Sequence, residues 1–143
     1  MDLIRQVIVF DALDVDSESK FWANLLGGVV VKDEDGKWDS VIDANGEWVL
    51  GVQFSSNHVP PSWPDGEQQQ VHLDFHIVNF EKAHKEVMEL GATLLQASED
   101  SESDQGFQVY SSPAGHPFCL GWGHPSKSEL RAFLETNKKN GAL

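Results

Sequence analysis

The sequence predicts an α+β fold made of two tandem βαβββ modules within one domain, and three observations carry this prediction. Each half of the 143-residue chain shows a strand pattern, a helical pattern ended by glycine, and then three further strand patterns. Both predicted helices carry an apolar stripe that must pack on a sheet face. A proline-rich stretch separates the halves. Because both halves repeat the same βαβββ order over roughly 55 residues, the chain is interpreted as a duplication.

The first module, at about 3–55, begins with an alternation of apolar and polar residues that predicts a strand at 4–13. Asp16 or Ser17 can cap the following helix, which we expect at 18–26. Gly27 and Gly28 end that helix. Runs rich in β-branched and aromatic residues, separated by turn residues, then predict strands at 29–32, 38–42 and 48–54.

The second module, at about 70–123, repeats this order. A strand is expected at 70–78 and a helix at 81–90, which Gly91 ends. Three more strands fit the patterns at 93–96, 107–111 and 118–122. An acidic, serine-containing stretch at 99–104 is expected to be a solvated loop.

The connecting segment and the end of the chain have different compositions. The linker at about 56–69 contains Pro60, Pro61 and Pro64, which do not suit regular structure, so we expect a lid or a crossover between the modules. Ser126 can cap a final helix at about 126–138, where Glu129 occupies the capping-box position.

Composition and charge exclude several classes of partner. The formal net charge of −13 disfavours nucleic acid and anionic membranes, because like charges repel. No apolar run approaches the roughly 20 residues that span a bilayer. Cys119 is the only cysteine, so an intrachain disulfide is impossible. Acidic residues interrupt the start of the chain where a secretion signal would need an apolar core, so we expect a cytoplasmic protein.

The most informative stretch for function is the strand that opens the second module. Polar and apolar residues alternate along it, so His72, Asp74 and His76 point to the same side. A strand that sends two imidazoles and a carboxylate to one side either lines a cleft or faces water. We expect Asp74 to line a cavity and His76 to be exposed at the strand's end.

Several stretches, together with the paired modules, resemble the vicinal oxygen chelate superfamily, which includes glyoxalases, bleomycin resistance proteins and extradiol dioxygenases. They are FWANLLG at 21–27, HLDF at 72–75, LGAT at 90–93 and SPAGHPFCL at 112–120. The likeness spans about 3–122 and is greatest to the glyoxalase-like branch. It implies two modules whose curved sheets enclose a central cavity, and usually a homodimer.

Enzymes of that superfamily hold a divalent metal on the first and last strands of each module. The resemblance transfers these positions to Val7, Gln53, His72 and Cys119, where the usual occupants are His, Glu or Gln, His and Glu. Valine has no donor atom, and Cys119 is a soft thiol where a hard carboxylate is expected. We therefore favour no bound metal. If one is present, His72, Gln53 and Cys119 would hold Zn, Ni, Mn or Fe.

Individual residues also match two other chemistries. His72 and Asp74 match the start of the facial triad of non-haem iron oxygenases, with His116 or His124 as the distant histidine. The barrel of such enzymes differs from the fold predicted here, which weighs against this reading. Cys119 could be a nucleophile activated by His72. Its apolar neighbours favour an unreactive buried cysteine instead.

Some of the tryptophans are further candidates for ligand binding. Trp22 and Trp122 are interpreted as core residues, whereas Trp38, Trp48 and Trp63 are candidates for stacking on a planar ligand. For Trp38 and Trp48, filling the core is an equal alternative. Trp63 lies in the linker and is a better candidate for a lid or a dimer contact.

The sequence supports three readings of function. The favoured reading is a small-molecule-binding protein that holds a planar or cationic guest in its cavity, lined by Gln53, His72, Asp74, Cys119, Trp38 and Trp63, without a complete metal site. The alternative is a metal-dependent lyase or dioxygenase with an atypical metal site, or an enzyme that uses His72 as a general base. A closed cavity in a domain that serves only for dimerisation is the third reading.

Overall fold

The predicted βαβββ order appears in both halves of the computed structural model. The structure describes residues 7–66 and 71–123, together with 125, 128, 129, 132 and 136. The first module contains, in chain order, β1 (Ile8–Ala12), α1 (Val15–Leu25), β2 (Val29–Lys32), β3 (Trp38–Ile42) and β4 (Trp48–Phe54). The second contains β5 (Leu73–His76), α2 (Phe80–Glu89), β6 (Thr93–Gln96), β7 (Gly106–Ser111) and β8 (Pro117–Trp122).

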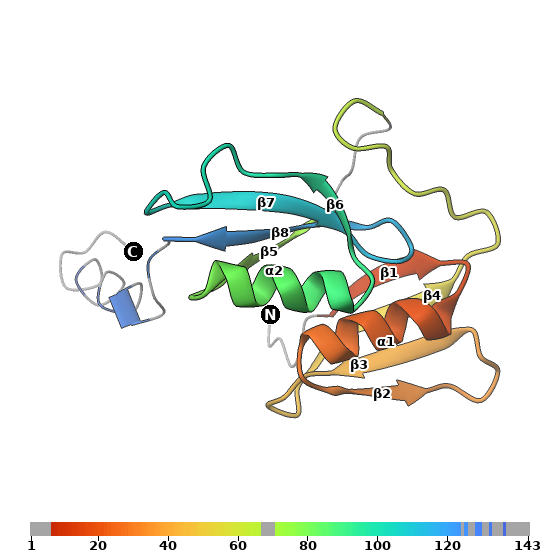
Figure 1. Cartoon of the computed structure of the whole chain (residues 1–143). Helices are drawn as coiled ribbons and strands as arrows, with labels where there is room; N and C mark the ends of the chain where they lie inside the picture. Colours follow the sequence, from red (N-terminus) through yellow and green to blue (C-terminus); the bar gives the residue numbers. More distant parts are fainter. Residues whose placement is uncertain are drawn as a thin grey trace.

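The two modules have the same sheet topology. In the part of the chain that the structure describes, the strands form two four-stranded sheets with the orders β1-β4-β3-β2 and β5-β8-β7-β6. In each sheet the first and last strands of the module run parallel, and the other neighbouring strands run antiparallel (Figure 1). The predicted α+β fold of two tandem modules is confirmed.

Helix α1 begins earlier than the sequence indicated. Its N-cap is Asp14, whose carboxylate accepts a hydrogen bond of 3.0 Å from the backbone N–H of Ser17. The prediction of a cap at Asp16 or Ser17 was wrong, because Asp14 has a carboxylate of the same capping ability and lies two residues after the end of β1. Asp16 and Ser17 instead occupy the first turn.

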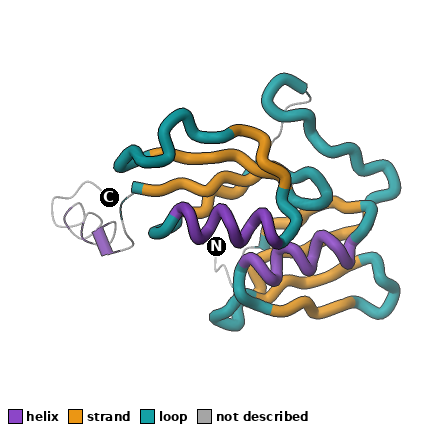
Figure 2. Tube along the Cα trace, viewed as in Figure 1, coloured by secondary structure: helices purple, strands orange, loops and turns teal. Residues whose placement is uncertain are grey.

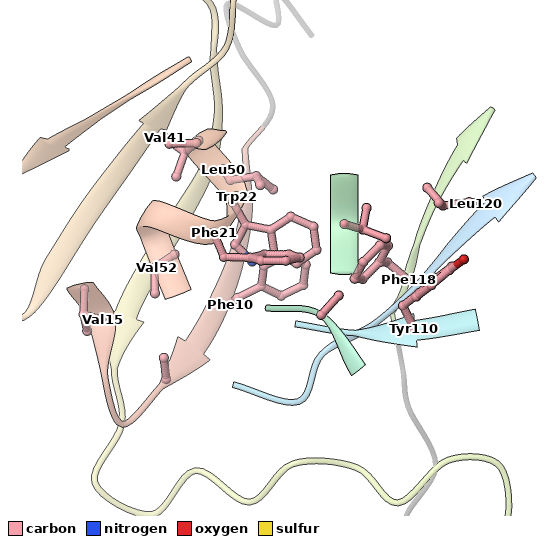
Figure 3. Close-up of a cluster of buried hydrophobic side chains, with 14 residues drawn as sticks. Phe10, Val15, Phe21, Trp22, Val41, Leu50, Val52, Tyr110, Phe118 and Leu120 are labelled. Carbon is pink, nitrogen blue, oxygen red and sulfur yellow. The ribbon is translucent and has the colours of Figure 1, made fainter. Parts of the chain in front are cut away.

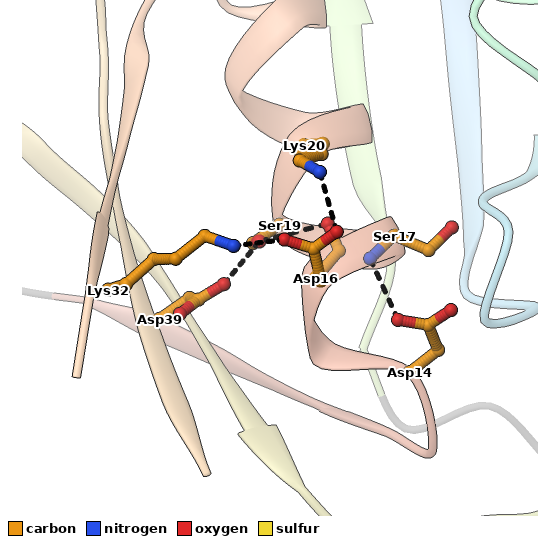
Figure 4. Close-up of polar contacts among 7 residues, drawn as sticks. All are labelled: Asp14, Asp16, Ser17, Ser19, Lys20, Lys32 and Asp39. Carbon is orange, nitrogen blue, oxygen red and sulfur yellow. Dashed lines mark hydrogen bonds and ion pairs between the residues drawn. The ribbon is translucent and has the colours of Figure 1, made fainter. Parts of the chain in front are cut away.

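Polar contacts hold α1 against the first sheet (Figure 4). The Asp16 carboxylate pairs with Lys20 on the same helix, at 2.6 Å, and with Lys32 on β2. Hydrogen bonds from Lys20 and then Lys32 lower the pKa of Asp16. The buried Ser19 hydroxyl donates to Asp39 on β3 at 2.6 Å, which satisfies a buried carboxylate at the helix–sheet interface.

The second module differs from its predicted bounds only at the ends of its elements. Helix α2 starts one residue early, capped by Asn79, whose side chain accepts from the Lys82 N–H. Strand β5 covers 73–76, so His72 lies immediately before it rather than within it. Of the predicted final helix, the described residues 128, 129, 132 and 136 are helical, and the rest of it lies outside the described residues.

One apolar core joins the modules (Figure 3). Helix α1 packs on the strands of its own sheet, and α2 packs on β8 (Figure 2). The fully buried Trp22 ring of α1 lies edge-on to Phe118 of β8, with their centroids 5.5 Å apart. Phe21 and Phe10 pack around the same rings, so the helix-covered faces of both sheets share this core. Trp22 and Trp122 are both buried, as expected.

A buried carboxyl group connects the modules inside this core. Glu18 of α1 accepts hydrogen bonds from Trp22 Nε1 at 2.7 Å, from Ser112 Oγ at 2.6 Å and from the Ala114 N–H at 2.7 Å. Ser112 and Ala114 belong to the turn between β7 and β8. The acidic side chain therefore fixes that turn, and with it β8, against the first module.

Candidate functional site

The helix-free face of the second sheet carries a pocket of about 270 Å³. Its lining residues come from three adjacent strands and the residue before β5, and they are His72, Asp74, His76, Phe107, Cys119 and Gly121. Strand alternation explains this set, because every second side chain leaves the core and points to the open face. In register, Asp74 lies opposite Cys119, and His76 lies opposite Gly121.

The pocket is open to solvent and has both polar and aromatic walls. The His72 and Asp74 side chains are 42% and 54% exposed, and Phe107 is 51% exposed. Gly121 has no side chain, which leaves room between His76 on one side and Phe107 on the other. His76 is exposed, as predicted, and it also lines the pocket.

Asp74 is the centre of the polar wall. Its carboxylate lies 3.5 Å from His72 Nε2 and accepts a hydrogen bond from the Cys119 thiol. Burial, and then the hydrogen bond and negative charge of Asp74, raise the pKa of Cys119 to about 12. The thiol is therefore protonated near neutral pH, whereas a nucleophilic cysteine needs a lowered pKa. This supports the interpretation of Cys119 as an unreactive thiol.

Among the described residues, His72, Asp74 and Cys119 form a group able to hold a metal ion, with one ligand atom from each lying within 4.8 Å of the others. The sequence paired His72 and Cys119 with Gln53 instead. Asp74 was predicted to line the cavity but not to act as a ligand. It joins the set because the parallel register of β5 and β8 puts it beside Cys119.

Gln53 and Trp38 lie on the open face of the first sheet, and neither lines this pocket. Gln53 Nε2 donates to Asp11 Oδ1 at 2.6 Å. The half-buried Trp38 ring lies over Gly51, where a Cβ would come within 2.4 Å of it. Val7, at the start of this sheet, is half-buried and offers no donor atom.

The remaining candidates lie elsewhere. Trp63 is half-buried in the linker and is not part of the pocket wall. His116 stacks on Phe10 with centroids 4.5 Å apart, and its Nε2 lies 2.6 Å from the Asp11 carbonyl oxygen, so it joins the modules rather than the site. The facial triad with His116 is not assembled, and His124 lies outside the described residues.

Sequence reasoning missed Phe107, which was interpreted only as a strand residue. It enters the pocket because it pairs with Gly121 across β7 and β8. The available signal was its alternation with the buried Gln108 and Tyr110, which places Phe107 on the same face as Val109 and Cys119.

Comparison with known proteins supports this architecture. A family model described as a glyoxalase-like domain matches residues 7–121. No curated protein sequence matches the chain.

Solved structures share the fold at low sequence identity. The fosfomycin resistance protein FosX from Listeria monocytogenes is 14% identical, with a TM-score of 0.65 over 89% of this chain and 96% of that one. A glyoxalase/dioxygenase from Nostoc punctiforme is 18% identical, with a TM-score of 0.62 over 87% and 94%. A glyoxalase/bleomycin resistance protein/dioxygenase family enzyme from Burkholderia phytofirmans PsJN is 14% identical, with a TM-score of 0.58 over 82% and 97%. At these identities the likeness shows the fold alone.

Proposed function

We propose that this chain, which belongs to the glyoxalase-like domain family of the vicinal oxygen chelate superfamily, binds a small polar molecule at a divalent metal ion held by His72, Asp74 and Cys119. The observation that carries the proposal is the convergence of a nitrogen, an oxygen and a sulfur donor within 4.8 Å on the wall of an open pocket. Protein sites that bind a metal and also act on a small molecule use three protein ligands and leave a position open.

The donor set fits a divalent ion by chemistry and by position. Imidazole, carboxylate and thiolate are all ligands of zinc and related ions. All three donor residues belong to the pocket wall. An ion held by them would therefore keep its other side toward the pocket, where a guest could bind to it. A bound ion would act as a Lewis acid that polarises a carbonyl group of the guest or lowers the pKa of a bound water.

The other wall residues orient the guest. The His76 imidazole can exchange a hydrogen bond or a proton with a polar group one strand step beyond Asp74, at a spacing of about 6.6 Å. The exposed Phe107 ring offers a flat surface for a planar group. Such a site suits lyase or dioxygenase chemistry of the superfamily on a small planar substrate.

Metal content tests the proposal directly. Protein purified without added metal and dialysed mildly is expected to retain about one equivalent of a divalent ion per chain, as measured by elemental emission. Asp74→Asn should lower this content, whereas Asp100→Asn in the exposed acidic loop should not. A chain that neither retains nor takes up any divalent ion would refute the proposal.

Metal-free binding of a planar or cationic molecule is a second candidate. The exposed carboxylate of Asp74 and the exposed ring of Phe107 favour it, because together they recognise charge and a flat surface without an ion. Thermal-shift measurements with planar cationic compounds on metal-stripped protein test this candidate, since a ligand stabilises the fold in proportion to its affinity. Loss of the shift in Phe107→Ala would locate the site.

We also propose that the chain forms a homodimer. The open face of the first sheet exposes Val9, Val29 and Val31, which are 44%, 60% and 55% exposed. Val9 lies on the edge strand β1 and the other two on the opposite edge strand β2, and exposed apolar side chains on one sheet face are typical of an interaction surface. Light scattering coupled to size exclusion is expected to give twice the chain mass of 15.9 kDa. Val31→Lys should shift the mass toward that of the monomer.

A further inference from the structure

The cation preference of the site follows from Cys119. The superfamily resemblance predicts a hard carboxylate at this position of the last strand, whereas this chain has a thiol. Thiolate sulfur favours Zn²⁺ and other soft or borderline ions, whereas Mg²⁺, Ca²⁺ and Mn²⁺ favour sites made of oxygen ligands. Exchanging oxygen for sulfur at this position therefore changes which ions the site can hold.

The geometry places the sulfur inside the donor set rather than beside it. Cys119 is the register partner of Asp74 in the parallel β5–β8 pair, and its Sγ lies within 4.8 Å of a ligand atom of Asp74 and of one of His72. His72 Nε2 lies 3.5 Å from Asp74 Oδ1. For an ion that binds to the His72 and Asp74 donors, the Cys119 sulfur is therefore the nearest available third ligand.

The distances suit a tetrahedral ion of zinc size. Metal–ligand bonds of about 2.0–2.3 Å put neighbouring ligand atoms roughly 3.3–3.8 Å apart. The His72–Asp74 separation of 3.5 Å already lies in this range. No pair of the three ligand atoms is farther apart than 4.8 Å, so each pair has to approach by about 1.5 Å at most to hold the ion.

The three donor residues do not suit ions that require six to eight oxygen ligands. Ca²⁺ takes six to eight oxygen ligands, and Mg²⁺ keeps octahedral geometry with oxygen ligands. Of the three grouped residues, Asp74 alone supplies oxygen. An ion of this class would have to take nearly all its ligands from water.

We infer that the His72, Asp74 and Cys119 site is selective for thiophilic divalent ions, namely Zn²⁺, Cd²⁺ and Co²⁺, over Mg²⁺, Ca²⁺ and Mn²⁺. The inference rests on the proposed function, since it specifies which ions that site accepts. Binding forms a bond between the metal and Cys119 Sγ and breaks the Sγ–H bond, and the proton passes to the solvent.

The test uses the full chain stripped of metal by a chelator. Titration with Co²⁺ is expected to produce a thiolate-to-cobalt charge-transfer absorption in the near ultraviolet, and calorimetry is expected to show binding of Zn²⁺ and Cd²⁺. Mg²⁺, Ca²⁺ and Mn²⁺ should bind at least about 100-fold more weakly than Zn²⁺.

A Cys119 variant and a matched control test whether the sulfur is a ligand of the ion. Cys119→Ser retains the size of the side chain but replaces sulfur with a hard oxygen. It should abolish the charge-transfer band and weaken Zn²⁺ binding by about 100-fold or more, since changes to groups that only support a ligand already cost 10–100-fold. Asp100→Asn, in the exposed acidic loop, should leave both readouts unchanged. Circular dichroism of each variant confirms that it is folded.

The outcomes separate the inference from the proposed function. Tight binding of Mn²⁺ or Mg²⁺ at the level of Zn²⁺, or a Cys119→Ser variant that binds Zn²⁺ like the wild type, would overturn the selectivity while leaving a metal site in place. Failure of every ion to bind would overturn both the ion selectivity and the proposed function.

Discussion

Removing the carboxyl group of Glu18 is expected to weaken the connection between the modules more than any surface change. Its oxygens accept three hydrogen bonds, from Trp22, Ser112 and the Ala114 N–H, at 2.6–2.7 Å. Two of these donors belong to side chains that water barely reaches, since Trp22 is 0% and Ser112 4% exposed. Glu18→Ala leaves both without an acceptor.

The magnitude follows from those two donors. A buried donor without a partner costs about 1–3 kcal/mol, so the two together should lower the free energy of unfolding by about 2–6 kcal/mol. Glu18→Gln retains one oxygen but turns an amide NH₂ toward a donor, so its cost should be smaller, about 1–2 kcal/mol. For a domain whose total stability is about 5–15 kcal/mol, the alanine variant should be severely destabilised.

Urea unfolding followed by tryptophan fluorescence measures these differences. Glu99→Ala, in the exposed acidic loop, is the matched control and should remain within about 0.5 kcal/mol of the wild type. A double-mutant cycle between Glu18→Ala and Ser112→Ala should show a coupling energy above about 0.5 kcal/mol. A Glu18→Ala variant as stable as the control, with no coupling to Ser112, would refute the reasoning.

Three further outcomes are expected. With its pKa raised to about 12, the Cys119 thiol of metal-stripped protein should react with iodoacetamide at pH 8 roughly 50-fold more slowly than an ordinary cysteine, and the rate should rise with pH. This figure combines about 1,000-fold less thiolate with its greater nucleophilicity. Asp74→Asn should accelerate the reaction in metal-stripped protein, because it removes the negative charge that helps to raise the pKa. Gly51→Ala should lower the urea midpoint, since the new Cβ would lie 2.4 Å from the Trp38 ring, and an unchanged midpoint would contradict this packing. Tyr110→Phe, which removes a buried hydroxyl with two side-chain hydrogen bonds, should cost about 1–3 kcal/mol in the same assay.

The fold could be predicted because its signals are local. Alternating residues gave the strands, and Gly27 and Gly91 gave the helix ends, each within a window of a few residues. The start of α1 was misplaced because Asp14, Asp16 and Ser17 are all competent caps. Which of them caps the helix depends on where β1 ends, and that is decided by pairing with β4 rather than by the local sequence.

The site was only half predictable for a physical reason. Alternation fixes which face a side chain occupies, so His72 and Asp74 could be placed together from the sequence. It does not fix which residue of another strand lies opposite, because that depends on register across a long connection. Cys119 was predicted to be a cavity residue only through the family resemblance, and its position opposite Asp74 follows from the pairing of β5 with β8. Phe107, which was not predicted, joins His76 at the site because β7 pairs with β8.

The strands that carry the donor residues determine how precisely the metal ligands are held. Asp74 and Cys119 lie on two strands paired through backbone hydrogen bonds, and β8 is paired on both edges, with β5 and β7. On its other face, β8 is held by the shared core through Phe118 and Leu120. Donors fixed on such strands are held more precisely than donors on loops. His72, just before β5, is the one donor outside a strand, so substitutions that loosen its backbone should affect metal affinity before they affect the fold. Val71→Gly tests this separation: it should weaken Zn²⁺ binding while leaving the free energy of unfolding within about 0.5 kcal/mol of the wild type, since Val71 is 58% exposed.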